Sequence, residues 1–231
     1  MLFDFDPAKH QLLKQDHFGV VSKEYSEQYG WVTYRNTQKA PWWTRSVARY
    51  LAKREAVTLK HLPLHPAIPR VLYWDGAHLL RSWIPAKPMQ IAQPRSAVYF
   101  SQAFKLLRFL HANNVAHNDL SKETNWLVTP NGQPALVDFQ LSRAFKTRTP
   151  WFRNSAREDI RYLLKHKYNF CPEHMTQREL KIRNTPALTS RVWRKTMKPL
   201  YLFITRKIFN WQDREGAYDR SAIQKPKSHN D

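Results

Sequence analysis

Residues 117–140 read HNDLSKETNWLVTPNGQPALVDFQ, and this stretch decides the fold. The Asn-Gly pair at 131–132 lies between two apolar runs and is a strong signal for the tight turn of a β-hairpin. If the two runs pair antiparallel, Asn125 and Asp138 lie at the same end of the hairpin, and Asp119 lies in the loop just before it. The sequence therefore predicts two carboxylates and one amide around one point, a set of oxygen ligands that suits Mg²⁺.

The order of Asp119, Asn125, a hairpin and the Asp-Phe pair that begins at Asp138 resembles the catalytic core of protein-kinase-like phosphotransferases. It is most similar to small bacterial lipopolysaccharide kinases (Kdo/heptose kinase-like) and RIO-type kinases, which have short lobes and an Asp-Phe pair not followed by Gly. The resemblance implies that Asp119 accepts or orients the proton of the substrate hydroxyl, while Asn125 and Asp138 hold magnesium. It covers roughly residues 17–165 and is specific around 117–140.

Two departures from the family pattern affect the expected metal site. The family places its metal-binding Asn five residues after the catalytic Asp, whereas Asn125 stands six residues after Asp119. Either one residue bulges out of the loop, or Glu123 or Thr124 supplies the ligand. Gln140 stands where the family has Gly.

A helix is predicted over about 43–61, because Val47, Leu51 and Leu59 recur at four-residue steps. Glu55 occupies the intervening step, and a carboxylate on an apolar helical face is costly unless a cation meets it. In the resemblance, Glu55 corresponds to the glutamate that pairs with a strand lysine in contact with the phosphates. Lys and Arg neighbours on the same helix are the alternative partners.

The strand lysine of the family has no direct equivalent here. Two predicted strands, at 18–25 and 31–35, carry Lys23 and Arg35. Arg35 has the expected spacing to the helix glutamate but is not a lysine, so we favour Lys23 for the phosphates and keep Arg35 and Lys39 as alternatives. With only 5 glycines and no G-x-G-x-x-G loop, any lid over the phosphates is reduced.

A second hairpin is predicted over 71–84, where two apolar runs flank an Asp-Gly pair. In the resemblance its exit becomes the hinge between two lobes, and backbone groups of Ser82 and Trp83 would hydrogen-bond adenine. Pro85 and Pro88 follow, as is typical of a connection between lobes.

Several helices are expected in the second half of the chain. One spans 96–114, and two begin at the capping boxes that open at Ser155 and Thr176. Asp159 would either brace the backbone of the catalytic loop or stabilise its own helix N-terminus. A last helix at about 199–211 is either a core helix or one that lies on an anionic membrane surface.

Together these elements predict an α+β fold, a small two-lobed protein-kinase-like architecture with a reduced helical C-lobe. The N-lobe would cover 1–84, the C-lobe with the catalytic loop and metal site 85–220, and a disordered tail 221–231.

The composition predicts a globular protein with anionic partners. Thirty-eight Lys and Arg residues against 18 Asp and Glu residues give a net charge of +20, which favours polyanions or is simply a solvated surface. The single Cys171 excludes an internal disulfide and fits a reducing compartment. Without a signal-peptide pattern or a membrane-length apolar run, we expect a cytoplasmic protein, with peripheral contact at the inner face of the membrane as the variant.

The expected function is transfer of the γ-phosphate of ATP, with Mg²⁺ as cofactor, to a hydroxyl group. The acceptor that the resemblance and the charge favour is a lipopolysaccharide-core sugar or a similar anionic glycolipid. The first alternative is a RIO-like protein serine/threonine kinase. The others are a pseudokinase that binds partners without turnover, and a basic RNA-associated protein, for which the sequence shows no RRM, KH or zinc-finger signature.

Overall fold

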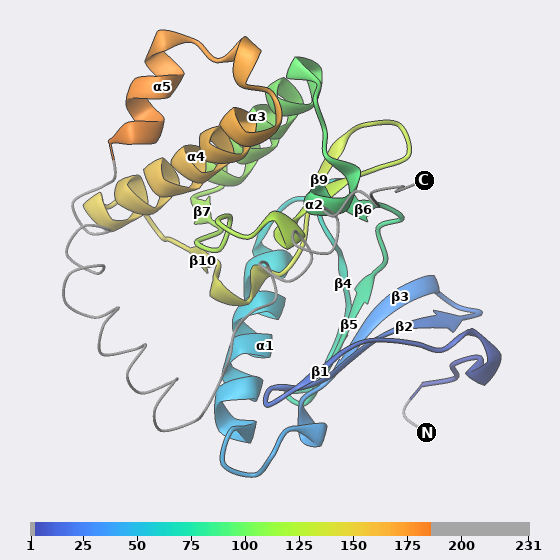
Figure 1. Cartoon of the computed structure of the whole chain (residues 1–231). Coiled ribbons are helices and arrows are strands. Elements are labelled where there is room, and N and C mark those ends of the chain that lie inside the picture. The colour runs from blue at the N-terminus through green and yellow to red at the C-terminus, as the bar shows by residue number, and fades with distance from the viewer. Residues whose placement is uncertain (1–2, 186–231) are drawn as a thin grey trace, which may run out of the picture.

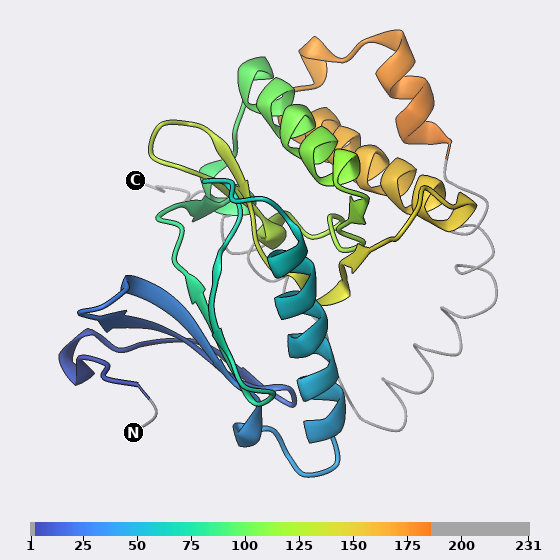
Figure 2. The same ribbon diagram turned by 180° about the vertical axis from the view of Figure 1, so that it is seen from behind.

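The structure, a computed structural model, describes residues 3–185. The predicted helix at 199–211 and the predicted tail at 221–231 lie outside the described residues. Within them, an antiparallel sheet occupies one end of the molecule and a group of helices the other, with helix α1 (Arg45–His61) between them (Figures 1 and 2). The α+β class is confirmed, and the arrangement is consistent with a small kinase-like fold. The boundary between lobes at residues 84 and 85 stays a prediction.

The larger sheet has five antiparallel strands in the order β1-β2-β3-β5-β4. Both predicted hairpins of this half of the chain are present, and an additional first strand, β1, precedes them. The side chains of β1 are nearly all exposed, so no alternation of apolar and polar residues marks it in the sequence. The strands are β1 (Gln11–Asp16), β2 (Gly19–Ser26), β3 (Gly30–Asn36), β4 (Val71–Trp74) and β5 (His78–Ser82).

Helix α1 buries a different face from the one that its leucine and valine spacing predicts. The buried apolar residues are Ala48, Ala52, Ala56 and Leu59, whereas Val47 is 49% exposed. The expectation that Val47 lies in the core is therefore wrong. Small alanine side chains let α1 approach its neighbours closely, and only the packing partners decide which stripe of a helix is covered.

The helices of the second half surround the main hydrophobic cluster. Helix α3 (Ala97–Ala112) corresponds to the helix predicted over 96–114, and it buries an apolar stripe of Ala103, Leu106, Leu107 and Leu110. Helix α5 (Gln177–Asn184) begins at the predicted capping box of Thr176 and Glu179.

Helix α4 (Pro150–Phe170) begins earlier than predicted. Thr149, not Ser155, is its N-cap, and the Thr149 side chain accepts a hydrogen bond from the Phe152 amide. Pro150 stands in the first turn, where its missing N–H costs nothing. The residues around 155 therefore form the helix interior, because a better cap with a following proline lies upstream.

Short elements connect these parts and build the site. They are β6 (Lys87–Pro88), α2 (Met89–Ala92), β7 (Val115–Ala116), β8 (Trp126–Val128), β9 (Pro134–Leu136) and β10 (Arg143–Ala144), with the 3-10 turns η3 (Glu123–Asn125) and η4 (Phe139–Leu141). Helix α1 packs beside η4, and the Arg54 guanidinium donates to the carbonyl oxygens of Leu141 and Ser142 at 2.9 and 3.1 Å. No helix in residues 3–185 is long and apolar enough to cross a membrane.

Candidate active site

The predicted hairpin is present and places its two ends together. Strands β8 and β9 pair antiparallel with Trp126 opposite Leu136, and Gly132 takes the positive φ of 71° that the tight turn needs. Just beyond the last strand pair, the Val137 amide donates to the Asn125 carbonyl at 3.1 Å. Asn125 and Asp138 therefore leave the hairpin at the same end, as the spacing predicts.

The loop that carries Asp119 is held by a carboxylate from helix α4. Asp159, almost completely buried, accepts hydrogen bonds from the backbone amides of His117 at 2.8 Å and Asn118 at 3.0 Å. The His111 ring lies 3.3 Å from the same carboxylate. The prediction that Asp159 braces the loop backbone is confirmed. Because the buried carboxylate accepts from two consecutive amides, it fixes the direction in which the chain enters the site.

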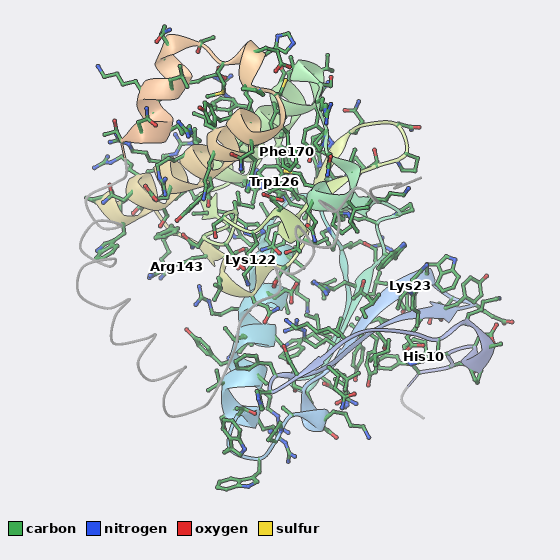
Figure 3. The ribbon with its side chains drawn as sticks, in the orientation of Figure 1. His10, Lys23, Lys122, Trp126, Arg143 and Phe170 are labelled. Carbon is green, nitrogen blue, oxygen red and sulfur yellow. The ribbon has the colours of Figure 1, made fainter. Side chains whose placement is uncertain are left out.

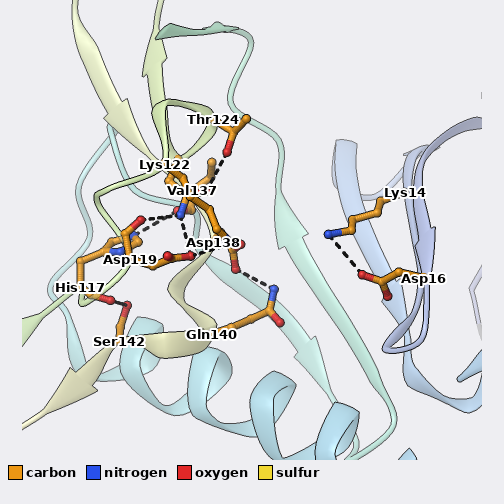
Figure 4. A network of polar contacts seen from close by, with 11 residues as sticks. Lys14, Asp16, His117, Asp119, Lys122, Thr124, Val137, Asp138, Gln140 and Ser142 are labelled. Atoms are coloured by element: carbon orange, nitrogen blue, oxygen red, sulfur yellow. Dashed lines mark hydrogen bonds and ion pairs between the residues drawn. The ribbon is translucent and has the colours of Figure 1, made fainter. Parts of the chain in front are cut away.

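Asp119, which Figure 4 shows close to Lys122 and Asp138, contacts Asn125 directly. The Asn125 Nδ2 group donates to the Asp119 backbone oxygen at 2.8 Å and to its Oδ2 at 3.0 Å. The extra residue between them is taken up by η3, a single 3-10 turn that ends at Asn125. Glu123 lies instead near His166 of α4, 3.9 Å from its Nδ1 atom. Thr124 hydrogen-bonds the Asn125 side-chain oxygen at 3.4 Å.

Asp138 stands at a sharp bend immediately after the hairpin. Its φ of 63° lies in the left-handed region, and the Gln140 amide group donates to its Oδ1 at 2.6 Å. The neighbouring Phe139 is buried against the His117 ring, with 4.6 Å between ring centroids, and His117 Nε2 lies 3.1 Å from the Val137 carbonyl. His117 thus packs and hydrogen-bonds so that the loop is held against the end of the hairpin.

The two carboxylates differ in electrostatic environment. Burial raises the pKa of Asp119, and the Asp138 charge adds to this shift while Lys122 opposes it. Burial also raises the pKa of Asp138, but Arg35, Lys122 and Arg81 outweigh it and hold that pKa below its usual value. One carboxylate is therefore the better proton acceptor, and the other is the more firmly ionised.

Lys122 is a site residue that the sequence analysis missed. Its ammonium group lies 3.3 Å from Asp119 Oδ2, and its side chain is about half exposed. A lysine in a polar loop carries no distinctive signal, because the exposed surface of this basic chain holds many of them. Only the folded loop shows that this one faces the Asp119 carboxylate.

Glu55 is buried at the predicted position on α1, but its cation is neither Lys23 nor Arg35. The Arg81 guanidinium of β5 pairs with it through Oε1, and both side chains are almost entirely removed from solvent. The expectation that a strand lysine or Arg35 pairs with Glu55 is therefore wrong, because the partner is Arg81, near the exit of the hairpin predicted over 71–84. In the sheet register Arg81 stands opposite Thr33, two positions from Arg35 along β3, which directs Arg81 and Arg35 to the same face.

Lys23 and Arg35 lie at different places on the sheet. The Lys23 ammonium group stacks over the rings of Trp31 and Trp83, 4.1 and 4.8 Å from their centroids. Arg35 is buried and close enough to lower the pKa of Asp138. Of the two, Arg35 is therefore the cation nearer to the predicted metal ligands. Lys39 lies in a short 3-10 turn after β3 and has no contact with the site among the described residues.

The predicted adenine-binding segment already uses two of its backbone donors. The Ser82 amide donates to the Arg70 carbonyl at 2.9 Å, and the Trp83 amide donates to the Trp31 carbonyl at 3.2 Å. Recognition of adenine through these two amides would need rearrangement. The proximity of Trp83 to Lys23 nevertheless brings two of the predicted nucleotide-binding residues together.

The turn between β1 and β2 takes the place of a glycine-rich loop. It consists of only His17 and Phe18 between paired Asp16 and Gly19. Gly19 has a φ of 110°, and a Cβ atom there would lie 2.3 Å from the Asn36 carbonyl oxygen, so the close backbone approach requires glycine. The Thr44 hydroxyl donates to the His17 carbonyl, which ties the turn to the start of α1.

The oxygen donors at this point fit a magnesium ion. Two carboxylates and an amide oxygen from Asp119, Asp138 and Asn125 are hard ligands. Burial and the nearby Asp138 charge raise the pKa of Asp119, and a divalent cation bound between the two carboxylates would relieve their repulsion. Asn125 with Asp138 would hold the ion, as the sequence analysis proposes, while Asp119 stays hydrogen-bonded to Asn125.

We expect removal of Arg81 to destabilise the protein because it leaves the Glu55 carboxylate buried without a cation. Arg81→Ala should lower the free energy of unfolding by about 3–5 kcal/mol, and Glu55→Leu combined with Arg81→Met by much less. Urea denaturation measures both. The control is Lys9→Ala, which removes the exposed Lys9–Asp6 pair and the contact of Lys9 with the Tyr25 ring and should cost far less. An Arg81→Ala protein as stable as the control would contradict the buried pair.

Asp119→Asn should raise the melting temperature at pH 7, although it removes the predicted proton acceptor. The raised pKa of Asp119 means that ionisation of this carboxyl group destabilises the folded state. The loss of stability is complete above the folded-state pKa. It disappears in acid, where the carboxyl group is protonated in both the folded and the unfolded state. Melting curves recorded from neutral to acidic pH measure the change. An Asp119→Asn protein that melts below wild type at pH 7 would contradict it.

Asp75→Asn is the control, because its effect on the melting temperature should be opposite to that of Asp119→Asn. Burial acts against ionisation of Asp75, but hydrogen bonds from His78 and Ala77 outweigh it and lower its pKa to about 2. Its charge therefore stabilises the fold above the unfolded pKa, and this contribution is lost as the pH falls towards 2. The substitution should lower the melting temperature at pH 7 and lose its effect in strong acid.

The chain is similar over part of its length to known protein kinases, and no protein-family model matches it. A segment is 35% identical over 77 residues to human cyclin-dependent kinase 20, covering 29% of this chain and 21% of the relative, and the match to the rat protein has the same values. Another match, to serine/threonine-protein kinase SCH9 of Saccharomyces cerevisiae, is 36% identical over 81 residues and covers 35% of this chain and 10% of that kinase. The chain thus spans about a fifth or less of these relatives. The similarity, together with the fold, supports a kinase-like protein in general terms.

Proposed function

We propose that this protein is a phosphotransferase that moves the γ-phosphate of ATP to a hydroxyl group, with Mg²⁺ bound beside the reacting phosphate. The observation that carries the proposal is the meeting of Asp119, Asn125 and Asp138 at one end of the β8–β9 hairpin, behind a loop clamped by Asp159. Partial similarity to protein kinases supports the same class of chemistry.

Different residues of the chain would handle the proton of the acceptor hydroxyl and the negative charge of the phosphoryl group. Asp119, whose pKa is raised, would accept the proton of the acceptor hydroxyl or orient that hydroxyl towards the phosphate. Asn125 holds Asp119 in place, and the exposed Lys122 beside it can meet the negative charge of the transferred phosphoryl group. When bound to Asn125 and Asp138, magnesium would neutralise phosphate charge, and most of the rate gain would come from positioning.

The phosphates of the bound nucleotide would contact arginine side chains in addition to lysine. Arg35 and Arg81 share one face of the sheet and both act on Asp138. Each has a buried Nε group without a hydrogen-bond partner. A planar guanidinium binds phosphate in a bidentate manner, so the pair can anchor the nucleotide. Lys23, beside Trp31 and Trp83, would lie nearer to the adenine end.

For the acceptor we propose an anionic glycolipid such as a lipopolysaccharide-core sugar. The net charge of +20 favours an acceptor that already carries negative groups. A serine or threonine of a protein, as in RIO-type kinases, is the alternative. The printed names of the partial relatives, a cyclin-dependent kinase and a serine/threonine-protein kinase, are compatible with it.

One observation favours a second function, nucleotide binding without turnover. The cation paired with Glu55 is an arginine from β5, and the amides of Ser82 and Trp83 are already engaged. A guanidinium tightly paired with a buried carboxylate is less free to follow a moving phosphate than a lysine. A pseudokinase built on this site would bind Mg-ATP and transfer nothing.

Mg-ATP should raise the melting temperature of wild-type protein but not of Asp138→Asn. At a concentration about 100 times the dissociation constant, the ligand adds roughly 2.7 kcal/mol of stability. Thermal melts with ATP and magnesium, ATP alone and magnesium alone measure the shift. The control, Asp75→Asn, lies on the β4–β5 turn and should keep the full shift. An equal shift in Asp138→Asn would contradict the metal assignment, and no shift in wild type would contradict the proposed nucleotide site.

Labelled γ-phosphate should appear in lipopolysaccharide when wild-type protein is incubated with Mg-ATP. Asp119→Asn should lower the rate by roughly 100-fold or more, because general-base catalysis is lost. Parallel reactions with a serine- and threonine-rich protein test the alternative acceptor. Label only in the protein would favour the RIO-like alternative, and nucleotide binding with no label in either acceptor would favour the pseudokinase.

A further inference from the structure

The outward face of α1 and the residues just before it expose an unusual number of large apolar side chains. Those on the helix follow each other at helical spacing and lie opposite the buried alanines. Among the described residues, the His17 ring lies beside Trp43 and the Arg54 guanidinium lies over the Tyr50 ring, yet each of the five side chains keeps about half or more of its surface exposed. They are Trp42 (82% exposed), Trp43 (47%), Val47 (49%), Tyr50 (59%) and Val57 (54%). We refer to these five residues, with Arg49 and Lys53 between them, as the outer α1 face.

The outer α1 face is also strongly basic. Residues 37–74 contain seven Lys and Arg side chains and a single carboxylate, that of Glu55, which is buried and neutralised by Arg81. Arg49 and Lys53 are exposed, and no carboxylate of the described residues lies within ion-pair distance of either. The face therefore presents positive charge that no acidic neighbour in the described chain compensates.

A pocket of about 470 Å³ continues this face towards the candidate active site. It lies between α1 and β10, and its walls combine apolar Tyr50 and Val57 with basic Lys53, Arg54 and Arg143. Figure 3 shows Arg143 near the end of α1, not far from Lys122 of the catalytic loop. A hollow with both apolar and cationic walls suits an amphiphilic group that carries a phosphate.

Hydrogen bonds connect this pocket to the loop that carries Asp119. Arg54 donates to the Leu141 carbonyl at 2.9 Å, and the Asn118 side-chain amide donates to the same carbonyl at 3.1 Å. A ligand held by the pocket would therefore lie against the segment that follows Asp138, which hydrogen-bonds the loop that carries Asp119.

We propose that the outer α1 face docks on the surface of an anionic lipid bilayer, with a lipid phosphate in the pocket beside Lys53, Arg54 and Arg143. Tryptophan and tyrosine prefer the interface between headgroups and hydrocarbon, and lysine and arginine attract anionic lipids. Nucleic acid would match the charge but not the exposed valines, and an acidic protein would not need so many exposed aromatic rings. The docking is peripheral and needs no nucleotide, so it stands apart from the proposed phosphate transfer.

Sedimentation with lipid vesicles tests the proposal on the full-length protein. Wild type should bind vesicles that contain phosphatidylglycerol and bind phosphatidylcholine vesicles far less. Arg49→Ala combined with Lys53→Ala should lower the partition coefficient on anionic vesicles by roughly 30-fold, about 5-fold for each charge. Trp42→Ala combined with Tyr50→Ala should weaken vesicle binding at low and at high salt, because salt does not screen the apolar contribution of these two side chains.

The matched control combines Val98→Ala with Lys105→Ala on α3, which removes one exposed apolar and one exposed basic side chain elsewhere. It should bind like wild type, and circular dichroism checks that every variant is folded. Equal binding of wild type and the α1 variants, or equal losses in the control, would overturn the proposal. So would binding to RNA that the α1 substitutions abolish while vesicle binding is absent. Vesicle binding kept by Asp138→Asn separates this result from failure of the nucleotide site.

Discussion

The candidate site depends above all on the hydrogen bonds that Asp159 accepts from two consecutive backbone amides. Those amides belong to His117 and Asn118, directly before Asp119, and the carboxylate comes from the middle of the long helix α4. A loop of this length has many conformations of similar energy, and a buried carboxylate that satisfies two amides selects one of them. The His117 ring then reaches the Val137 carbonyl, so the clamp also connects the loop to the end of the hairpin.

This anchoring lets the chain keep conformations that would otherwise be unfavourable. Asn118 and Asp138 have φ values of 65° and 63°, in the left-handed region, and they flank the two ends of the site. Asn and Asp tolerate this region better than other residues, yet each still costs free energy that the surrounding contacts must offset. The bend at Asp138 turns its side chain towards Asp119 and Gln140 instead of continuing the strand (Figure 4).

Charge compensation at the site comes from the sheet. A buried carboxylate on α1 and an ionised Asp138 both need cations, and β3 and β5 supply Arg35 and Arg81 from one face. Guanidinium groups are permanently charged, so they supply this compensation at every accessible pH. Further cations lie along α1 on its outer face, where exposed aromatic residues accompany Arg49 and Lys53. Both the candidate active site and the outer α1 face are suited to bind a phosphate group, on a nucleotide in the first case and on a lipid in the second.

Local sequence patterns were sufficient where a short segment determines its own structure. The Asn-Gly turn, the capping box at Thr176, the apolar stripe of α3 and the meeting of Asn125 with Asp138 all follow from turn chemistry and periodicity. The start of α4 was missed because two capping signals compete within a few residues, and β1 because its side chains are exposed.

Tertiary structure alone decided which partners meet across the chain. Arg81 and Glu55 are 26 residues apart, and several basic residues could have filled that role until the sheet register placed one of them against the helix. The same holds for Lys122 beside Asp119, and for the stripe of α1 that is buried, where alanines and not Val47 face the core. Spacing along a chain determines which residues share a face, but the packing of distant elements determines what that face contacts.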